Sequence, residues 1–578
     1  MPNSDPLRAA EAALTAPGAP FEVVRAEDGS PLYAGGPRTL REFVEAVWAY
    51  GDQAFLVAES GTYTYGEFFA AASALARRFV EEYGLAPGDR AVIAMRNHPE
   101  WQVAFWGAQL AGLVAVPLNA WWTEAEFAYA LDDCTPRVVL VDGERLARVE
   151  AWLAGRWGAQ RDGQEGRPER PRVVVFHGGG GKWGEAYEGI RAADPLLGPP
   201  DVDVRAEDDA TIIYTSGTTG RPKGAVATHL AQAGAATHPR FHAALSALGR
   251  GQVPGQGSAP VSLMTFPFFH VAAFTALYSV MAAGGTLVLM RKWDAAQALA
   301  LIREHKVTHY AGVPATALQL LDAAEAAGDE LASLTMLNTG GAAAPAELVG
   351  RLTARYGERI EPRNGYGLTE TSGGVLANFG AAYRACPGSV GRPAPGVEVR
   401  IAGPQGQPLP EGEGEGEGEV GELWLRGQSL IRGYWNDPDA TSQAFADGGW
   451  FRTGDLATVR DGRVSIVDRI KDMVIRGGEN VYCVEVESVL HDHPDVLDAA
   501  VLGVPHPVLG EEVAAVVQLR PGATAGADEL RAHVGKHLAA FKVPAHLLVR
   551  DEPLPRNATG KVLKRELRTT AGLLVSGG

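Results

Sequence analysis

Short apolar runs alternate with longer helical patterns over residues 36–160. The apolar runs, which are typical of buried strands, lie at 91–95, 114–118 and 138–141. Segments in which apolar side chains recur with helical spacing lie at 64–83 and 101–110. Buried strands separated by helices predict a mostly parallel sheet with helices on its faces.

The pattern changes twice towards the C-terminus. Two segments with alternating polar and apolar positions, 397–401 and 421–426, lie on either side of a Glu–Gly tract at 411–419, and they predict a small β subdomain beside a solvated loop. After Asp468 the elements become shorter, with helical patterns at 484–490 and 528–538 and strand patterns at 499–504, 513–519 and 546–550. About 110 residues with their own apolar positions are enough for a separate α+β domain.

The net charge and the cysteine content limit the kinds of binding partner and the cellular compartment that fit this sequence. A net charge of −17 over 578 residues argues against nucleic acid as a partner, because phosphate backbones require a basic surface. Cys134, Cys386 and Cys483 have neither zinc-ligand nor disulfide-framework spacing, which predicts free thiols and a cytoplasmic protein. No leader pattern opens the sequence, and no run reaches the roughly 18 apolar residues of a spanning helix, so we expect no integral membrane segment. Peripheral membrane contact and a homodimer remain compatible with this composition.

The segment richest in candidate chemistry is Tyr214–Gly224, YTSGTTGRPKG, which follows the apolar run 211–213. Four Ser or Thr hydroxyls and three glycines lie within these eleven residues. Glycine lets the backbone curl closely around a polyphosphate, hydroxyls and freed N–H groups supply donors, and Lys223 adds a mobile cation. Pro222 precedes that lysine and Gly224 follows it, so the segment is not a Walker P-loop. It predicts a phosphate loop for a nucleotide.

Five segments in register give the chain a resemblance to a known family. The loop is similar to the phosphate loop of the adenylate-forming superfamily, which contains acyl-CoA synthetases, luciferases and the adenylation domains of peptide synthetases. Four further segments match in the same order: NGYGLTE at 364–370, GWFRTGD at 449–455, DRIKD at 468–472 with GGEN at 477–480, and PRNATGK at 555–561. The resemblance covers most of the chain and is strongest to the acyl-CoA synthetase branch.

The resemblance implies a fold that combines α/β and α+β domains. Residues 1–467 would form a large N-terminal domain of stacked mixed sheets flanked by helices, together with the small β subdomain. Residues 468–471 would form a hinge that includes Lys471. Residues 472–578 would form a small mobile α+β C-terminal domain.

Candidates for binding ATP or AMP come from several of these segments. The phosphate loop would hold the phosphates, a run of small residues would form the wall of an adenine slot, Asn364 would read the base edge and Tyr366 would stack on the base. Asp455 is the ribose candidate, and Arg469 would support ribose or the α-phosphate. The full set is Thr215, Ser216, Gly217, Thr218, Thr219, Gly220, Lys223, Gly341, Ala342, Ala343, Asn364, Gly365, Tyr366, Gly367, Asp455 and Arg469.

Three residues are predicted to take part in the chemistry, and a fourth to bind a metal ion. The resemblance implies that Lys561 reaches from the small domain to the α-phosphate and the acid, where one cation offsets the repulsion between two anions. A carboxylate beside a polyphosphate requires a cation between them, so we expect Glu370 to bind Mg²⁺, with Thr369 beside it as a second catalytic candidate. A histidine in an apolar segment is more often a core group than a catalyst, and we interpret His270 as lining the acid pocket and orienting the substrate.

The segment after the hinge carries the candidates for the second substrate. Gly477 and Gly478 would let the pantetheine arm of coenzyme A pass close to the backbone, although an ordinary turn is an alternative. Arg476 departs from the small residue that many relatives have before this pair, and the sequence leaves open whether it contacts a coenzyme A phosphate or faces water.

These residues predict an AMP-forming acyl-CoA synthetase that uses ATP, Mg²⁺ and coenzyme A. The apolar bias around His270 favours a fatty or aryl acid, as in a long- or medium-chain fatty acid–CoA ligase. Two alternatives share these motifs, a stand-alone adenylation enzyme that loads a carrier protein and a luciferase-like oxidase of the adenylate. A non-enzymatic nucleotide sensor is the least consistent alternative, because Lys561 and Glu370 are both present.

Overall fold

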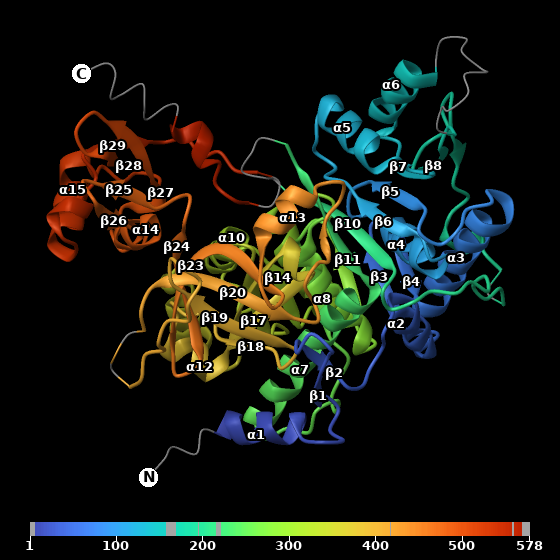
Figure 1. The fold of residues 1–578 in the computed structure, drawn as a ribbon, viewed down its shortest axis with the longest axis horizontal. Coiled ribbons are helices and arrows are strands. Elements are labelled where there is room, and N and C mark those ends of the chain that lie inside the picture. The colour runs from blue at the N-terminus through green and yellow to red at the C-terminus, as the bar shows by residue number, and fades with distance from the viewer. Residues whose placement is uncertain are drawn as a thin grey trace.

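A computed structural model describes residues 6–157, 169–194, 196–215, 221–414, 416, 418–557 and 560–568. Figure 1 shows a large body that contains the blue, green and yellow segments, and a smaller body formed by the orange-red C-terminal elements. None of the described helices is long and apolar enough to cross a membrane.

One large sheet of the N-terminal body has nine strands and supplies the nucleotide-binding candidates 341–367. Its strands in spatial order are β18 (Arg392–Pro393), β17 (Gly373–Phe379), β16 (Glu361–Leu368), β15 (Met336–Gly340), β14 (His309–Gly312), β12 (Val261–Met264), β13 (Thr286–Leu289), β3 (Ala54–Ala58) and β4 (Gly61–Thr64). The strands from β16 to β3 are parallel, and β17 and β4 are antiparallel to their neighbours.

The second large sheet has eight strands and carries the phosphate-loop hairpin. In spatial order they are β21 (Gly433–Tyr434), β11 (Lys223–Thr228), β10 (Asp209–Thr215), β6 (Val114–Pro117), β5 (Arg90–Ala94), β7 (Val138–Asp142), β8 (Arg172–Phe176) and β9 (Glu185–Ala186). The run from β10 to β9 is parallel. This confirms the parallel sheet expected from the apolar runs, which are buried on both faces as parallel strands require.

The main core of the N-terminal body joins residues from both large sheets with the helices packed on them. These are α3 (Tyr65–Arg77), α4 (Pro99–Leu110), α7 (His229–Gly249) and α8 (Val271–Ala282). Every residue of α4 is buried, as expected for a helix that is apolar on all sides. The start of α3 is fixed by a capping box in which the Thr64 and Glu67 side chains each accept a backbone N–H.

The remaining helices of this body cover the outer faces and edges. They are α1 (Pro6–Thr15), α2 (Leu40–Val47), α5 (Glu124–Cys134), α6 (Leu146–Trp157), α9 (Ala295–His305), α10 (Pro314–Ala326), α11 (Ala346–Tyr356), α12 (Gly380–Ala385) and α13 (Pro438–Ala444). A two-stranded ribbon, β1 (Val23–Arg25) with β2 (Pro31–Tyr33), lies near α1 (Figure 1).

The predicted β subdomain is a five-stranded antiparallel sheet. It contains β19 (Val397–Ala402), β20 (Gly421–Gly427), β23 (Trp450–Arg460), β22 (Phe445–Ala446) and β24 (Arg463–Arg469). The alternating segments 397–401 and 421–426 are the paired strands β19 and β20, as expected. This sheet completes the stacked mixed sheets of the N-terminal domain.

The C-terminal body has its own sheet and its own apolar core. The strands are β26 (Glu479–Val481), β25 (Val474–Arg476), β28 (Gly510–Leu519), β27 (Val496–His506) and β29 (His546–Arg550), and the helices are α14 (Cys483–His491) and α15 (Ala527–His537). A separate apolar cluster joins these elements. The α+β C-terminal domain expected from the sequence is therefore present.

Candidate functional site

The two described phosphate-loop candidates, Thr215 and Lys223, lie on neighbouring antiparallel strands. Thr215 at the end of β10 pairs with Lys223 at the start of β11. The Lys223 ammonium lies 5.3 Å from the centre of the Tyr434 ring. The other candidates of the loop lie outside the described residues; they are Ser216, Gly217, Thr218, Thr219 and Gly220. The described ends of the hairpin thus place a hydroxyl and a cation on neighbouring strands.

Glu370 faces this hairpin from a short 3-10 helix, Thr369–Thr371, which follows β16. The Tyr434 hydroxyl donates a hydrogen bond of 2.8 Å to Glu370 Oε1. Tyr434 reaches the carboxylate because β21 pairs with β11 at the edge of the eight-stranded sheet. Burial raises the pKa of the Glu370 carboxyl. Thr369 precedes Glu370 in the same short helix, so both predicted residues lie beside the hairpin.

The Glu370 carboxylate fits a magnesium site. One of its oxygens accepts the hydrogen bond from Tyr434, and no other residue in the described part of the chain donates a hydrogen bond to the second oxygen. A desolvated carboxylate that accepts a hydrogen bond from one other side chain, close to the predicted phosphate-loop hairpin, is the kind of protein ligand that Mg²⁺ shares with nucleotide phosphates. Tyr434 was not among the residues predicted from the sequence. The adjacent aromatic pair Tyr434–Trp435 is the sequence feature that could have indicated it.

Tyr366, Asp455 and Arg469, three of the nucleotide candidates, form one polar cluster. The Tyr366 hydroxyl donates a hydrogen bond of 2.6 Å to Asp455 Oδ2, and Arg469 Nε lies 3.2 Å from Asp455 Oδ1. Asp455 and Arg469 are directly opposite each other in the β23–β24 pair. Asp455 is only 3% exposed. Burial, reinforced by the Asp455 anion, raises the pKa of Tyr366 well above its usual value, so this phenol stays protonated and remains a donor.

The predicted wall of the adenine slot lies where β15 and β16 end side by side. Gly340 pairs with Gly365, and the chain leaves β15 through Gly341, whose φ of +76° favours glycine, before Ala342 and Ala343. Asn364 is buried within β16.

Gly367, another nucleotide candidate on β16, has a packing reason to be glycine. A Cβ at this position would collide with the carbonyl of Gly373 on the neighbouring strand β17. Its role in nucleotide binding stays a prediction.

Lys561 lies in a turn of the C-terminal domain that contacts the N-terminal domain. A Cβ at the neighbouring Gly560 would lie 3.0 Å from Val313 Cγ2, so this turn of the small domain contacts the large one. In Figure 1 the red segment that precedes the C-terminus runs from the small body towards the large body. Lys561 keeps contact with solvent, yet its surroundings desolvate the ammonium and, with the cations of Arg469 and Lys471, lower its pKa to about 8. The lowered pKa indicates that the described residues compensate the positive charge of Lys561 only in part.

The predicted hinge lies where the chain passes from one sheet to another. Strand β24, which ends at Arg469, belongs to the β subdomain, whereas β25, which begins at Val474, belongs to the C-terminal sheet. The Asp468 carboxylate accepts a hydrogen bond from the backbone N–H of Cys483 at the start of α14. Lys471 lies between the two sheets, and burial together with Arg469 lowers its pKa.

Gly477 and Gly478 form the two-residue turn of the β25–β26 hairpin, in which Arg476 pairs with Glu479. Their φ angles are +61° and +91°. Tight hairpins of this kind require positive φ at both central residues, so the turn alone explains the glycines. Arg476 NH2 lies 3.4 Å from Glu512 Oε1. The sequence left open whether Arg476 contacts a coenzyme A phosphate or faces water. In the structure its guanidinium pairs with a carboxylate on β28.

His270 has a structural role that its sequence context did not reveal. It is the N-cap residue of α8, and its Nδ1 accepts the Ala272 N–H at 3.2 Å. Burial lowers its pKa to about 4, so the imidazole is neutral at pH 7. Burial is the one cause of this shift, and therefore no charged group of the described chain acts strongly on the ring. His270 can orient a substrate as a neutral group, but it does not act as a cation at neutral pH.

Comparisons with known proteins cover most of the chain. The profile of the AMP-binding enzymes matches residues 43–435, and the profile of their C-terminal domain matches residues 485–561. The chain is similar to the feruloyl-CoA synthase of an Amycolatopsis species, with 35% identity over 85% of this chain and 90% of the relative. It is also similar to a long-chain-fatty-acid–CoA ligase of Mycobacterium tuberculosis, with 34% identity over 86% of this chain and 92% of the relative. A solved anthranilate CoA ligase in complex with anthranoyl-AMP superposes with a TM-score of 0.80 and 25% identity, over 93% of this chain and 98% of that one.

Proposed function

This chain belongs to the family of AMP-binding enzymes, and from that membership we propose that it is an AMP-forming acid–CoA ligase. The reaction joins a carboxylic acid to coenzyme A while ATP is cleaved to AMP and pyrophosphate. The observation that carries the proposal is the contact of the Gly560–Lys561 turn of the C-terminal domain with Val313 of the N-terminal domain, together with the electrostatic influence of Arg469 and Asp455 on Lys561. A cation delivered by one domain to the nucleotide site of the other is what a charge-neutralising first step requires.

In the first half-reaction a carboxylate oxygen of the acid attacks the α-phosphorus of ATP, and pyrophosphate leaves with the electrons of the broken P–O bond. No general base is needed, because the carboxylate is already a nucleophile at neutral pH. We assign the Asp455 carboxylate to the ribose hydroxyls and the Tyr366 ring to the base, and Arg469, which pairs with Asp455, to support of ribose or the α-phosphate. The Lys561 ammonium contacts both the attacking carboxylate and the α-phosphate, which offsets their repulsion and the charge of the transition state.

Glu370 would hold the Mg²⁺ ion that accompanies ATP, with Tyr434 fixing one carboxylate oxygen. The ion supplies positive charge to the phosphate oxygens of the leaving group when it is bound. The raised pKa of Glu370 means that burial disfavours the ionised form of its carboxyl group. A bound cation stabilises that form, so Glu370 ionises most readily when a cation is present.

In the second half-reaction the sulfur of coenzyme A attacks the acyl carbonyl of the adenylate, AMP leaves, and the thiol proton passes to solvent. We assign Lys561 to the first half-reaction, so thioester formation would require the C-terminal domain to move and withdraw this lysine. We place the pivot within 468–471, at Lys471, and the boundaries of the two domains at 467 and 472. The β25–β26 turn with Gly477 and Gly478 would then face the adenylate. A hinge motion of this kind lets one pocket serve two reactions.

The acid is proposed to be apolar, either aryl or fatty. Both kinds of substrate appear in the names of relatives at similar identity, feruloyl-CoA synthase and long-chain-fatty-acid–CoA ligase. His270 supports this class, because its pKa responds to burial alone and no described carboxylate stands near it to bind the ammonium of an α-amino acid. Medium and long acyl chains and hydroxycinnamate-like acids are the first candidates.

The reducing cytoplasm is the proposed location. Cys134, Cys386 and Cys483 are all free, and the first and last are buried. Free thiols are ordinary in a reducing compartment, where structural disulfides are rare.

The test is an assay of AMP and pyrophosphate release across fatty, aryl and amino acids, with and without coenzyme A. The proposal expects release that requires an apolar acid, and acyl-CoA as the product when coenzyme A is present. Acyl transfer to a carrier protein alone, or light or peroxide output that requires O₂, would favour the two alternatives. Formation of ADP in place of AMP would overturn the proposal.

A further inference from the structure

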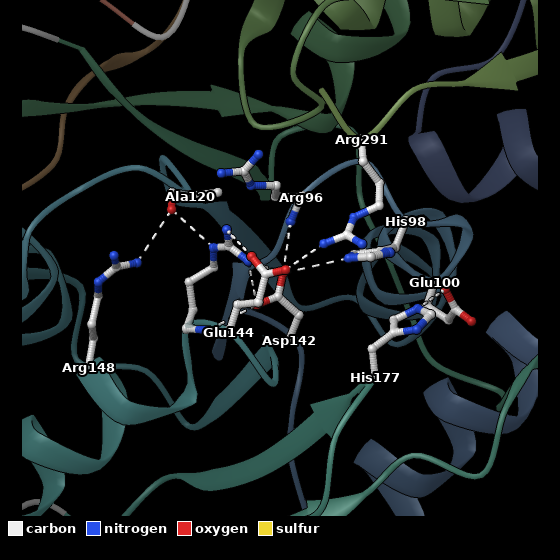
Figure 2. Close-up of polar contacts among 10 residues, drawn as sticks. Arg96, His98, Glu100, Ala120, Asp142, Glu144, Arg148, His177 and Arg291 are labelled. Carbon is white, nitrogen blue, oxygen red and sulfur yellow. Dashed lines mark hydrogen bonds and ion pairs between the residues drawn. The ribbon is translucent and has the colours of Figure 1, made fainter. Parts of the chain in front are cut away.

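A second cluster of chemical groups lies at the far half of the eight-stranded sheet, on strands that hold none of the nucleotide candidates. Strand β5 pairs with β6 on one side and with β7 on the other. The chain therefore reverses direction across the sheet at β5, and ligand sites in parallel sheets lie beyond the carboxyl ends of the strands at such points. Side chains that follow β5, β7 and β8 converge there, as Figure 2 shows.

Three of these side chains have atoms that can bind a metal ion. His98 precedes α4, Glu100 lies in its first turn, and His177 follows β8. One potential ligand atom from each lies within 4.8 Å of the other two. His177 Nε2 is 2.7 Å from Glu100 Oε2, and the two imidazole rings stack with their centres 4.1 Å apart. Glu100 is a buried carboxylate, which is rare unless the group has a partner.

A simple ion pair between Glu100 and His177 does not account for the position of His98 beside them. The Glu100–His177 hydrogen bond does not involve it, and no hydrogen bond to its ring is found among the described residues. Its side chain is nevertheless only 11% exposed. Asp142 Oδ2 lies 3.9 Å from His98 Nε2, which is too far for a hydrogen bond. A largely buried imidazole with no hydrogen bond to the described residues leaves its ring nitrogens available to a ligand or to water.

Asp142 has the position of a group that orients a metal-binding histidine. Arg145 NH1 donates to both of its carboxylate oxygens, at 2.8 and 2.6 Å, and the backbone N–H of Arg96 donates to Oδ2 at 3.1 Å. A carboxylate fixed in this way can accept the Nε2–H of His98, which leaves Nδ1 free as a ligand. Histidines that bind metals commonly donate their other ring N–H to a carboxylate.

Two of the guanidiniums around the cluster are paired with carboxylates. Four guanidiniums lie in the region, on Arg96, Arg145, Arg148 and Arg291, together with the three carboxylates of Glu100, Asp142 and Glu144. Arg145 is paired with both Asp142 and Glu144, and Arg291 is paired with Glu144. An imidazole binds a metal ion in its neutral form, so His98 and His177 would supply nitrogen ligands without adding positive charge.

We propose that His98, Glu100 and His177 bind one divalent transition-metal ion of the Zn²⁺ type, at a site separate from the Mg²⁺ site at Glu370. Two imidazole nitrogens and one carboxylate are a preferred ligand set for such ions, whereas Mg²⁺ prefers oxygen alone. The ligand atoms must draw together to about 3.3 Å, as bonds of about 2.0–2.1 Å in a tetrahedral site require. Rotation of the His177 side chain, which is 35% exposed, provides this movement and leaves a fourth position to water.

The experiment is calorimetric titration of ZnCl₂ into the full chain after treatment with a chelator, in the absence of ATP and Mg²⁺. The expected result is one equivalent bound to the unmodified chain, and at least tenfold weaker binding in His98→Asn, His177→Asn and Glu100→Gln. The visible absorption of bound Co²⁺ provides a second readout, and it should disappear in His98→Asn. Glu100→Gln keeps a hydrogen-bond acceptor for His177, so this variant separates loss of the ligand from loss of folding.

His546→Asn is the matched control. His546 Nε2 lies 3.3 Å from Glu512 Oε2, a His–Glu pair on the C-terminal domain that does not belong to the three-ligand cluster, and its loss should leave Zn²⁺ binding unchanged. The proposal is overturned if the unmodified chain takes up no Zn²⁺, if His98→Asn binds as tightly as the unmodified chain, or if His546→Asn removes the binding. None of these outcomes depends on the ligase reaction, because no ATP, acid or coenzyme A is present.

Discussion

Replacement of Lys561 by alanine should separate the two half-reactions. Burial, together with the charges of Arg469 and Lys471, lowers the pKa of Lys561 to about 8. Before substrates bind, the surrounding residues, which include Asp455, therefore compensate its positive charge only in part. When the acid and the α-phosphate bind, two anions supply that compensation. Lys561→Ala should therefore slow adenylate formation while thioester formation from supplied acyl-adenylate changes little, because that step needs the domain to carry Lys561 away.

The size of the loss follows from the charges involved. An ammonium about 4 Å from an anion, at an effective dielectric constant of about 20, contributes about 4 kcal/mol. A tenfold change in rate corresponds to about 1.4 kcal/mol, so adenylate formation should fall by about a thousandfold. Loss of one preorganised donor to a developing anion in other enzymes has a similar effect, of about 10²–10³.

The assay follows pyrophosphate release from acid and ATP for the first step, and acyl-CoA formation from synthetic acyl-adenylate for the second. Lys536→Ala is the control, since Lys536 is an exposed lysine on α15 of the same domain. Both rates should remain within about threefold of the unmodified enzyme in this control, as expected for an exposed position away from the site. Equal losses in the two half-reactions of Lys561→Ala would refute the assigned role.

Three further variants test other parts of the site. The cationic form of Lys561 is the active one and its pKa is about 8, so kcat/KM for adenylation should decline as the pH rises above that value. Lys561→Arg should move this decline to higher pH, and an unchanged pH profile would contradict the assigned role of Lys561. Gly478→Leu should slow thioester formation more than adenylation, whereas Gly522→Leu, at another positive-φ glycine with open space in the same domain, should spare both half-reactions; equal effects would indicate strain alone. Asp455→Asn should raise the KM for ATP about tenfold or more by weakening the ribose contacts, measured by initial rates at saturating acid, and an unchanged KM would exclude Asp455 from the ribose site.

The sequence predicts single residues of the site better than it predicts their contacts. Asp455 and Arg469 were both selected from motifs, but their ion pair depends on the register of β23 and β24, which no local pattern specifies. Tyr434 was missed for the same reason, since it meets Glu370 only through the pairing of β21 with β11. Contacts between segments far apart in the chain arise from tertiary packing, and so spacing cannot reveal them.

Local backbone geometry explains the remaining differences. The sequence predicted that three glycines face a ligand, Gly367, Gly477 and Gly478. The structure gives each of them another reason to be glycine: Gly477 and Gly478 form a tight turn, and Gly367 packs closely against a neighbouring strand. His270 likewise read as a pocket residue, and its first role in the structure is to cap α8. The layers and their strands were easier to predict, because the short, continuously apolar runs at 91–95, 114–118 and 138–141 correspond directly to β5, β6 and β7.

The cross-strand pair of Asp455 and Arg469 has a thermodynamic consequence. Arg469 is the last residue of β24, so the chain leaves this pair directly into the segment around Lys471. If the pair binds ribose as proposed, a bound nucleotide biases the orientation of the C-terminal domain, and by linkage that orientation changes the affinity for the nucleotide by the same factor. Retained AMP would then delay the return of the C-terminal domain, and nucleotide release would limit the rate of successive turnovers.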